Sequence, residues 1–264
     1  MTSIDVCIPT FNSGNVLEGT LDRLKCAEDY CSIKISTLRV TDNKSTDSTT
    51  NILEEVTDEY GWGLDLEKTE SSLPEARQSL ISRVKSDWFL FLDDDVRLSE
   101  DYFELMFSCM AEGIGAIQGR KKSKQQTSSN DQRLINDVPT KPTEWVRKRS
   151  FRGGTHATLI RKEACEDIKF PCDLVVWEDE YLRRHIESSG YLWIFNHQAL
   201  FSHANQERHP PSWTEGYLQA KYNLRPFWHV CLNLPYAILT GKSPIGYMLM
   251  IVGYVCAWLK NLVN

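Results

Sequence analysis

The sequence predicts an α/β fold in which an open, mostly parallel, doubly wound sheet is flanked by helices and followed by an apolar helical tail. Short apolar segments of strand type alternate with segments of helical periodicity in the first half of the 264-residue chain, as expected for parallel strands joined by crossover helices. One of these segments, Trp88–Leu92, is apolar at every position, which is typical of a strand buried on both faces of a parallel sheet. Beyond Pro211 the chain becomes apolar and aromatic, which predicts the tail.

The N-terminal half carries a local signal for each element. We expect strands at Ile4–Pro9, Leu38–Thr41, Leu64–Leu66 and Trp88–Leu92. Asn12 and Ser13 are helix-capping types, and apolar residues then recur at helical spacing over residues 16–24. Asp47 can cap a second helix over residues 52–56, and Pro74 suits the first turn of a third helix over residues 76–84. Ligands of such sheets bind beyond the carboxyl ends of the strands, so the polar residues that follow the strands are expected at one rim.

A change of composition divides the chain. Residues 119–150 are polar, basic and without period, which predicts either a mobile loop or a solvated insertion. Residues 151–205 recover apolar segments and contain an acidic cluster within Trp177–Tyr181. We therefore expect one domain in two halves, residues 1–117 and 118–205, followed by an apolar and aromatic helical extension over residues 206–264.

Charge, cysteines and missing motifs exclude several classes of protein. The formal net charge is -6 and the sequence pI is about 5.6, without the basic footprint of a nucleic-acid-binding protein. The eight cysteines form no Cys-x-x-Cys pair and no charged-then-apolar leader is seen, so we expect free thiols in the cytoplasm. Glycine-rich phosphate loops, dinucleotide fingerprints and the Gly-x-Ser-x-Gly motif are absent, which argues against kinases, ATPases, dehydrogenases and hydrolases.

Three consecutive acids, Asp93, Asp94 and Asp95, follow the most apolar strand. Adjacent carboxylates repel one another, and a divalent cation offsets that cost directly because magnesium and manganese prefer oxygen ligands. The alternative is a solvated acidic turn before a helix that begins near Ser99. Because the strand should end at the rim where ligands bind, the pattern favours a binding site.

A second acidic cluster, Glu178, Asp179 and Glu180, precedes apolar residues at helical spacing and is therefore expected in the first turn of a helix. The acids can stabilise the helix dipole and pair with Arg183 and Arg184. Alternatively, one of them can act as a general base for a hydroxyl group. Spacing alone slightly favours the first interpretation.

Histidine spacing gives little direct support for a metal site. Of the six histidines, His203 follows the apolar run Ala199–Phe201 and is expected near a strand end. A single histidine is more often structural than a ligand, and no zinc-binding spacing is present.

Taken together, the segments between residues 4 and 205 resemble the family 2 glycosyltransferases, which have the GT-A fold. The resemblance rests on VCIPTFN (Val6–Asn12), VTDNKSTDST (Val40–Thr49), PEAR (Pro74–Arg77), FLFLDDD (Phe89–Asp95) and WEDEYLRR (Trp177–Arg184), in that order. Each segment alone is weak, but their order and separations together are specific. The chain departs from the family pattern at Lys44, where glycine is common, and at Gln78 and Leu80, where asparagine and glycine are usual. None of these changes removes a charged catalytic position, so an active enzyme is expected.

The resemblance implies a role for each site residue. The nucleotide-sugar donor would be bound by Pro9, Thr10, Phe11, Asn12, Asp42, Arg77, Asp93 and Asp94. A divalent cation, Mn²⁺ or Mg²⁺, would be held by Asp95 and His203 and would bridge the two phosphates. The catalytic base would be Asp179, and the acceptor side would be bordered by Gly154, Thr155, Trp177 and Glu178.

The implied function is the inverting, metal-dependent transfer of a hexose from a nucleotide-diphosphate sugar, with a UDP-sugar expected, to a hydroxyl of a glycan or lipid-linked acceptor. Such a reaction would serve the synthesis of envelope, polysaccharide or glycoconjugate glycans. The alternative is a non-catalytic nucleotide-sugar-binding or assembly protein of the same fold. A sugar-phosphate nucleotidyltransferase is less favoured, because the glycine-rich loop with a basic residue expected there is missing from residues 8–16.

The tail leaves two interpretations open. Its aromatic residues alternate with aliphatic ones and suit either packing on the catalytic domain or a membrane interface. The uncharged stretch Ser243–Leu259 is shorter than the roughly 20 residues of a spanning helix. We expect peripheral attachment to the cytoplasmic face of a membrane as one outcome, supported by basic residues at 120–122 and 147–149 that can attract anionic headgroups.

Overall fold

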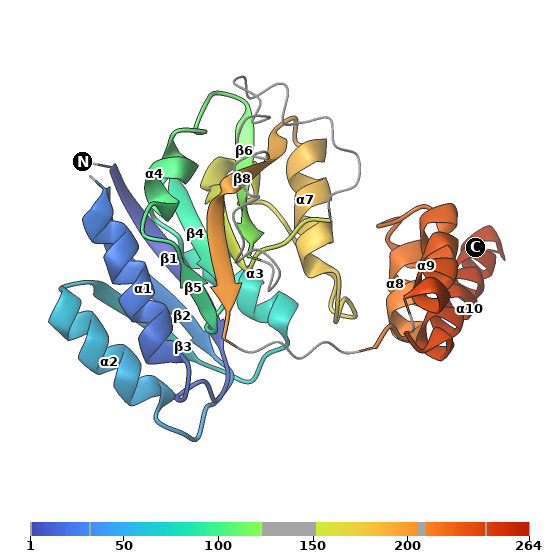
Figure 1. Ribbon diagram of the computed structural model, residues 1–264, viewed down its shortest axis with the longest axis horizontal. Coiled ribbons are helices and arrows are strands. Elements are labelled where there is room, and N and C mark those ends of the chain that lie inside the picture. Colours follow the sequence, from blue (N-terminus) through green and yellow to red (C-terminus); the bar gives the residue numbers. More distant parts are fainter. Residues whose placement is uncertain (1, 32, 123–151, 205–209, 241, 264) are drawn as a thin grey trace.

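The structure is a computed structural model that describes residues 2–31, 33–122, 152–204, 210–240 and 242–263. Most of the predicted loop at 119–150, including the basic residues at 147–149, lies outside these ranges. The described residues form an α/β domain and a separate group of three helices at the C-terminus (Figure 1). The predicted α/β fold with an apolar helical tail is therefore confirmed.

Eight strands form one sheet, in the spatial order β3-β2-β1-β4-β7-β6-β8-β5. The strands are β1 (Thr2–Thr10), β2 (Ile33–Asp42), β3 (Gly63–Lys68), β4 (Trp88–Leu92), β5 (Val96–Leu98), β6 (Ile114–Lys121), β7 (Ala157–Arg161) and β8 (Leu192–His203). The pairs among β3, β2, β1 and β4 are parallel, as is the pair of β6 with β8. Strand β7 is antiparallel to both β4 and β6, and the short β5 is antiparallel to β8.

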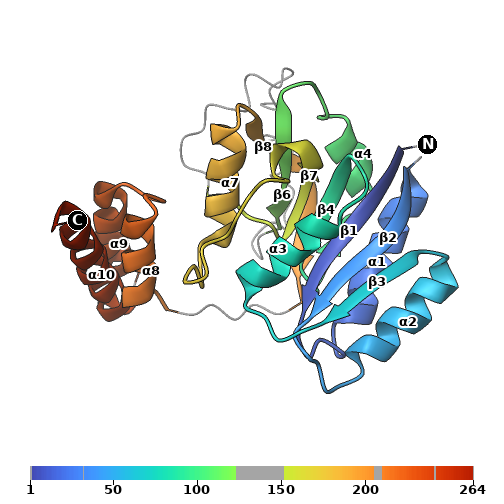
Figure 2. The same ribbon diagram turned by 180° about the vertical axis from the view of Figure 1, so that it is seen from behind.

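Helices cover both faces of this sheet (Figures 1 and 2). The helices of the domain are α1 (Leu17–Tyr30), α2 (Thr49–Tyr60), α3 (Leu73–Arg83), α4 (Tyr102–Phe107) and α7 (Glu178–Ser188), with a short 3₁₀ turn, η1 (Lys162–Ala164). The larger core joins α1, α2 and α4 to one face of the sheet, and the smaller core joins α3 and α7 to the other.

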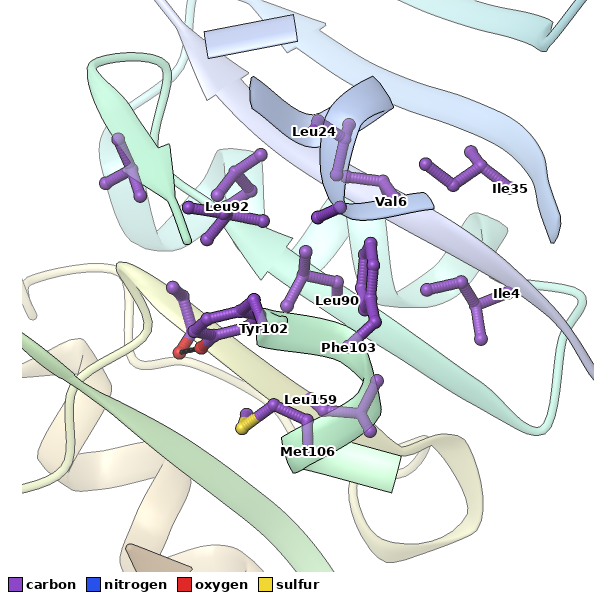
Figure 3. Close-up of a cluster of buried hydrophobic side chains, with 14 of the residues drawn as sticks. Ile4, Val6, Leu24, Ile35, Leu90, Leu92, Tyr102, Phe103, Met106 and Leu159 are labelled. Atoms are coloured by element: carbon purple, nitrogen blue, oxygen red, sulfur yellow. Dashed lines mark hydrogen bonds between the residues drawn. The ribbon is translucent and has the colours of Figure 1, made fainter. Parts of the chain in front are cut away.

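Strand β4 shows why its sequence is apolar throughout. Leu90 and Leu92 belong to the larger core, where Figure 3 shows them with Phe103 and Tyr102 of α4, whereas Phe89 and Phe91 belong to the smaller core. Successive side chains of a strand point to opposite faces, so a strand covered on both faces needs apolar residues at every position. This confirms the prediction drawn from the WFLFL run.

The start of α1 differs from the prediction. The helix begins at Leu17, and Val16 is its N-cap residue, so Asn12 and Ser13 do not cap it. Asn12 Oδ1 instead accepts a hydrogen bond from the Thr46 amide at 2.9 Å, and the Ser13 hydroxyl donates to Asp94. These two polar side chains thus organise the rim of the sheet. Pro74 does lie in the first turn of α3, as predicted.

The C-terminal helices are α8 (Trp213–Lys221), α9 (Phe227–Leu239) and α10 (Pro244–Val263). Helices α8 and α10 are in direct backbone contact, because a Cβ atom on Gly216 would lie 1.7 Å from the carbonyl oxygen of Met250. Helix α10 has 20 residues and is long and apolar enough to cross a membrane, judged by length and composition alone. The expectation that this stretch is too short was wrong, because the helix continues past Lys260.

Candidate active site

A cleft of about 460 Å³ opens at the carboxyl ends of the parallel strands. It is lined by the end of β1 and the turn after it, by the start of α3 and by all three acids that follow β4. The predicted residues Pro9, Thr10, Phe11, Asn12, Asp93, Asp94 and Asp95 are among its walls. The structure therefore brings together in one cleft seven of the predicted donor and metal residues.

Two predicted donor residues, Asp42 and Arg77, do not line this cleft. Asp42 is fully buried and accepts hydrogen bonds from the amide and hydroxyl of Ser45, while its neighbours Thr41 and Asn43 line the cleft. The turn after Asp42 includes Lys44 at a φ of 57°, a left-handed conformation that favours glycine. Asp42 thus shapes the turn, and its contact with a nucleobase stays a prediction.

The three consecutive acids have three different partners. Asp93 Oδ2 lies 2.5 Å from Nδ1 of His156, and Asp95 Oδ1 lies 3.0 Å from Nδ1 of His203. Asp94 accepts a hydrogen bond from the hydroxyl of Ser13. The alternative of a plain solvated turn does not account for this, because each carboxylate contacts a different segment of the chain. The expected helix start near Ser99 is also wrong, since β5 occupies Val96–Leu98 and α4 begins at Tyr102.

These partners separate the pKa values of neighbouring acids. Burial tends to raise the pKa of Asp93, but the His156 imidazole and the Arg77 guanidinium outweigh it and hold that pKa far below its usual range. For Asp94, burial raises the pKa, and the charges of Asp93 and Asp95 raise it further. Asp93 is therefore a fixed negative charge, whereas Asp94 is the more easily protonated of the two.

His156 was not predicted as a site residue. It directly precedes β7, and because β7 is antiparallel to β4, its first residue, Ala157, pairs with Leu92 at the end of β4. The ring of His156 lies 4.9 Å from that of His203, measured between centroids. The sequence offered no signal beyond a histidine before an apolar segment, because the antiparallel pairing that places it is a long-range feature.

Arg77 connects the acids after β4 with the start of α7. It is 2% exposed, its Nη1 donates to Glu178 Oε1, and its Nη2 lies 3.4 Å from Asp93 Oδ1. A buried guanidinium between two carboxylates fixes both in position. The two acidic clusters therefore belong to one connected network. The open wall of the cleft does not include Arg77, so its predicted contact with the base or the diphosphate stays a prediction.

The three acids at the start of α7 divide between the two interpretations left open by the sequence. Glu180 accepts hydrogen bonds from Arg183 and Arg184 and from the amide of Gly153, which is a structural role. Glu178 pairs with Arg77, outside its own helix.

Asp179 has a different set of partners. It is 6% exposed, and its Oδ1 accepts from the Glu180 amide at 2.7 Å and lies 3.2 Å from Arg152. Burial raises the pKa of Asp179, the Arg152 charge opposes the rise, and the Glu178 charge adds to it. A carboxylate with a raised pKa is better suited to accept a proton near neutral pH.

The segment Gly153–Thr155, which includes the predicted acceptor-side residues Gly154 and Thr155, meets α7 through Gly153. A Cβ atom on Gly153 would lie 2.6 Å from the carbonyl oxygen of Asp179, so this position needs glycine. Gly154 donates to Gln118 at 3.2 Å, and Thr155 is buried. Trp177 is the N-cap residue of α7 with a φ of 72°, an unfavourable conformation for a bulky side chain.

Asp95 and His203 fit part of a cation site. A carboxylate oxygen and an imidazole nitrogen that face each other at 3.0 Å are both ligand types that Mn²⁺ accepts, and a cation can replace the proton they share. In the part of the chain that the structure describes, no group of three or more Asp, Glu, His or Cys residues could hold a metal ion by itself. Ligand phosphates and waters would complete the coordination shell, as is usual for magnesium bound with nucleotides.

A family model and several solved structures match this chain. The model of the family described as glycosyl transferase family 2 matches residues 5–169. No curated protein matches the chain.

Solved structures share the fold at low sequence identity. The S. aureus protein TarS, residues 1–349 with UDP-GlcNAc, superposes with a TM-score of 0.59 at 16% identity over 79% of this chain. The mannosyltransferase PcManGT from Pyrobaculum calidifontis, with GDP-Man and Mn²⁺, gives 0.60 at 18% identity, covering 95% of this chain and 69% of its own. Glucosyl-3-phosphoglycerate synthase from Mycobacterium tuberculosis, with Mn²⁺, UDP and glucosyl-3-phosphoglycerate, gives 0.54 at 16% identity, covering 78% and 73%. The match spans only 60% of the TarS chain.

Proposed function

Because the chain belongs to glycosyl transferase family 2, we propose that it transfers a sugar from a nucleotide-diphosphate donor, a UDP-sugar, to an acceptor hydroxyl with inversion at the anomeric carbon. The observation that carries the proposal is the Arg77 bridge, which joins Asp93 in the cleft to Glu178 beside Asp179. A single displacement needs the donor diphosphate and the base for the acceptor in one site, and this bridge supports that arrangement.

Asp179 is the proposed base. Its position is held by the Glu180 amide, by Arg152 and by the close contact of its backbone with Gly153. As the acceptor oxygen attacks the anomeric carbon, Asp179 takes the hydroxyl proton, and the bond to the diphosphate oxygen breaks. A positioned carboxylate of this kind contributes about 100- to 10,000-fold to the rate.

Asp95 and His203 would hold a divalent cation. When bound, such a cation neutralises charge on the leaving diphosphate. Asp93, kept ionised by His156 and Arg77, would accept hydrogen bonds from hydroxyl groups of the donor. The turn over Pro9–Asn12 would contact the nucleobase. It presents the ring of Phe11, which is 56% exposed, next to the polar side chains of Thr10 and Asn12.

The test is the release of UDP from a panel of UDP-sugars by the wild type and by Asp179→Asn. We expect the substitution to lower turnover by about 100- to 10,000-fold while the affinity for UDP changes little. Glu187→Gln, an exposed acid on the same helix that pairs with Arg183, is the control and should keep its turnover. If Asp179→Asn turns over like the wild type, Asp179 is not the base; if the wild type binds the nucleotide but no donor is cleaved, the chain is a nucleotide-sugar-binding protein.

We also propose that the C-terminal helices attach the protein to the cytoplasmic face of a membrane. Apolar side chains on α9 and α10 are widely exposed, including Leu239 at 85%, Ile245 at 66% and Trp228 at 59%. No acidic residue follows Glu215, whereas Lys221, Arg225, Lys242 and Lys260 do. An apolar surface with basic residues suits an anionic leaflet.

Vesicle flotation tests this attachment. The full chain should float with vesicles that contain anionic lipid, and Leu239→Glu with Trp228→Glu should reduce the floating fraction severalfold. Tyr30→Glu, at a residue 56% exposed on α1, is the matched control and should float like the wild type. If the variant with Leu239→Glu and Trp228→Glu floats as well as the Tyr30→Glu control, the C-terminal helices are not the attachment site.

A further inference from the structure

Two arginines from distant segments contact the ring of Trp177. The guanidinium carbon of Arg152 lies 3.8 Å from the ring centroid, and that of Arg225 lies 4.7 Å from it. Arg225 belongs to the connection between α8 and α9, next to Leu224, whose carbonyl oxygen accepts a hydrogen bond from Arg184 of α7 at 2.8 Å. The C-terminal helices therefore add a positive charge directly beside the start of α7.

Among the described residues, Arg225 forms no ion pair with the acids around this ring, although the charges of Glu180, Asp179 and Glu215 act on it at longer range. Arg152 is paired with Asp179, Glu178 is paired with Arg77, and Glu180 is paired with Arg183 and Arg184. Within the described ranges, no carboxylate lies within 4.0 Å of the Arg225 guanidinium; the nearby Glu215 is partly buried and forms no ion pair. The charge of Arg152 acts unfavourably on Arg225, and an anion bound beside these two guanidinium groups would relieve that repulsion.

An apolar hollow begins two residues after Arg225. It has a volume of about 400 Å³ and is lined by Phe227 of α9 and by Tyr254, Val255 and Trp258 of α10. The Tyr254 hydroxyl donates to the carbonyl oxygen of Arg225 at 2.7 Å, which ties the hollow to the arginine. Charged and apolar binding features thus adjoin each other on the same short segment.

We propose that this segment binds the acceptor, and that the acceptor is an amphiphile that carries a phosphate group and a hydrocarbon chain in addition to the hydroxyl group that receives the sugar. The phosphate contacts Arg225 and Arg152, and the chain occupies the hollow between α9 and α10. This inference rests on the proposed function, because only a base at Asp179 makes the bound molecule an acceptor. Because Arg152 also pairs with Asp179, a phosphate bound to Arg152 places the acceptor next to the proposed base.

Calorimetry with octyl phosphate below its micellar concentration tests the proposal. The full-length protein should bind octyl phosphate saturably, and should bind inorganic phosphate and 1-octanol at least about tenfold more weakly, since each lacks one of the two features. Arg225→Gln should weaken octyl phosphate binding about tenfold or more, and Arg225→Lys should recover part of it. Trp258→Ser should weaken octyl phosphate binding while leaving the response to inorganic phosphate unchanged.

Three controls make the result decisive. Arg23→Gln removes a partly exposed arginine of α1 that pairs with Glu100, and it should bind octyl phosphate like the wild type. Thermal melting checks that each variant is folded. UDP titration with manganese in the same variants separates the two hypotheses: intact UDP binding with no octyl phosphate binding overturns this inference alone, whereas absence of UDP binding overturns the proposed function.

Two further outcomes would contradict the proposal that the site binds an amphiphile. If 1-octanol binds as tightly as octyl phosphate, the hollow recognises apolar surface only and Arg225 has no part in it. If inorganic phosphate binds as tightly as octyl phosphate, the arginines form a small-anion site and the hollow is not used.

Discussion

Replacing Arg77 with methionine tests the link between the two acidic clusters. The guanidinium of Arg77 is buried between Glu178 and Asp93, and Glu178 is itself 7% exposed. Methionine fills a similar volume but leaves two largely buried carboxylates without their cation. Breaking a buried ion pair in this way costs about 3–5 kcal/mol. For a domain of this size, 1 kcal/mol lowers the melting temperature by about 2–4 °C, so Arg77→Met should melt about 6–20 °C below the wild type.

The stability lost in Arg77→Met should be larger at neutral pH than at acidic pH. Burial favours a higher pKa for Asp93, but His156 and Arg77 lower it below that of the unfolded chain. An acid with a lowered folded-state pKa adds stability above its unfolded pKa, and that stability is lost as the pH falls through the folded-state pKa. Without Arg77 this contribution shrinks, and protonation then relieves the unpaired acids. Because the ordinary pKa of Asp93 is 3.8, the stability difference between wild type and variant should be larger near about pH 6 than near about pH 2.5.

The assay is chemical unfolding at both pH values, together with UDP binding by calorimetry. The control is Arg39→Met, because Arg39 forms a similarly buried pair with Asp5 at 2.7 Å, on residues that do not line the cleft. Both variants should lose stability, and only Arg77→Met should also weaken UDP binding. A cost below about 1 kcal/mol, as for an exposed ion pair, or equal UDP affinity in both variants, would refute the structural role given to Arg77.

Three further substitutions test separate parts of the site. Gly153→Ala should push a methyl group against the backbone of Asp179. Turnover should fall about 100-fold because the base is misplaced, while the UDP affinity measured by calorimetry stays unchanged. Normal turnover would show that Gly153 does not position Asp179. Asp95→Ala should abolish the manganese dependence of UDP binding, and a wild-type response to added manganese and to EDTA would count against Asp95 as a ligand. Asp94→Asn should raise the melting temperature at neutral pH, because burial and its acidic neighbours already disfavour the charge of Asp94; a lower melting temperature would contradict that electrostatic account.

Much of the first half of the fold could be predicted from local sequence patterns. The run Trp88–Leu92 matches β4 residue for residue, and Pro74 lies in the first turn of α3. These elements are set by interactions between near neighbours, namely two-sided burial and helix-start geometry. Three-residue β5 was missed, because so short a strand is defined by its pairing with β8 and not by its own pattern.

The site could be predicted only where it follows strand ends. The acids after β4 and the turn after β1 meet in the cleft because parallel strands end at the same edge. His156, Arg152 and Arg225 could not be found in this way. His156 is placed by an antiparallel strand, and Arg152 and Arg225 approach Trp177 from segments far apart in the chain. Such placement depends on long-range packing, which local periodicity does not contain.

The central claim is tested most directly by anomalous diffraction from a crystal of the full-length protein grown with UDP and manganese. The account predicts one manganese peak in contact with Asp95, His203 and the diphosphate, with the uridine against Pro9–Asn12 and Asp179 facing the same cleft. Manganese bound away from Asp95, or UDP bound outside the cleft, would contradict the account.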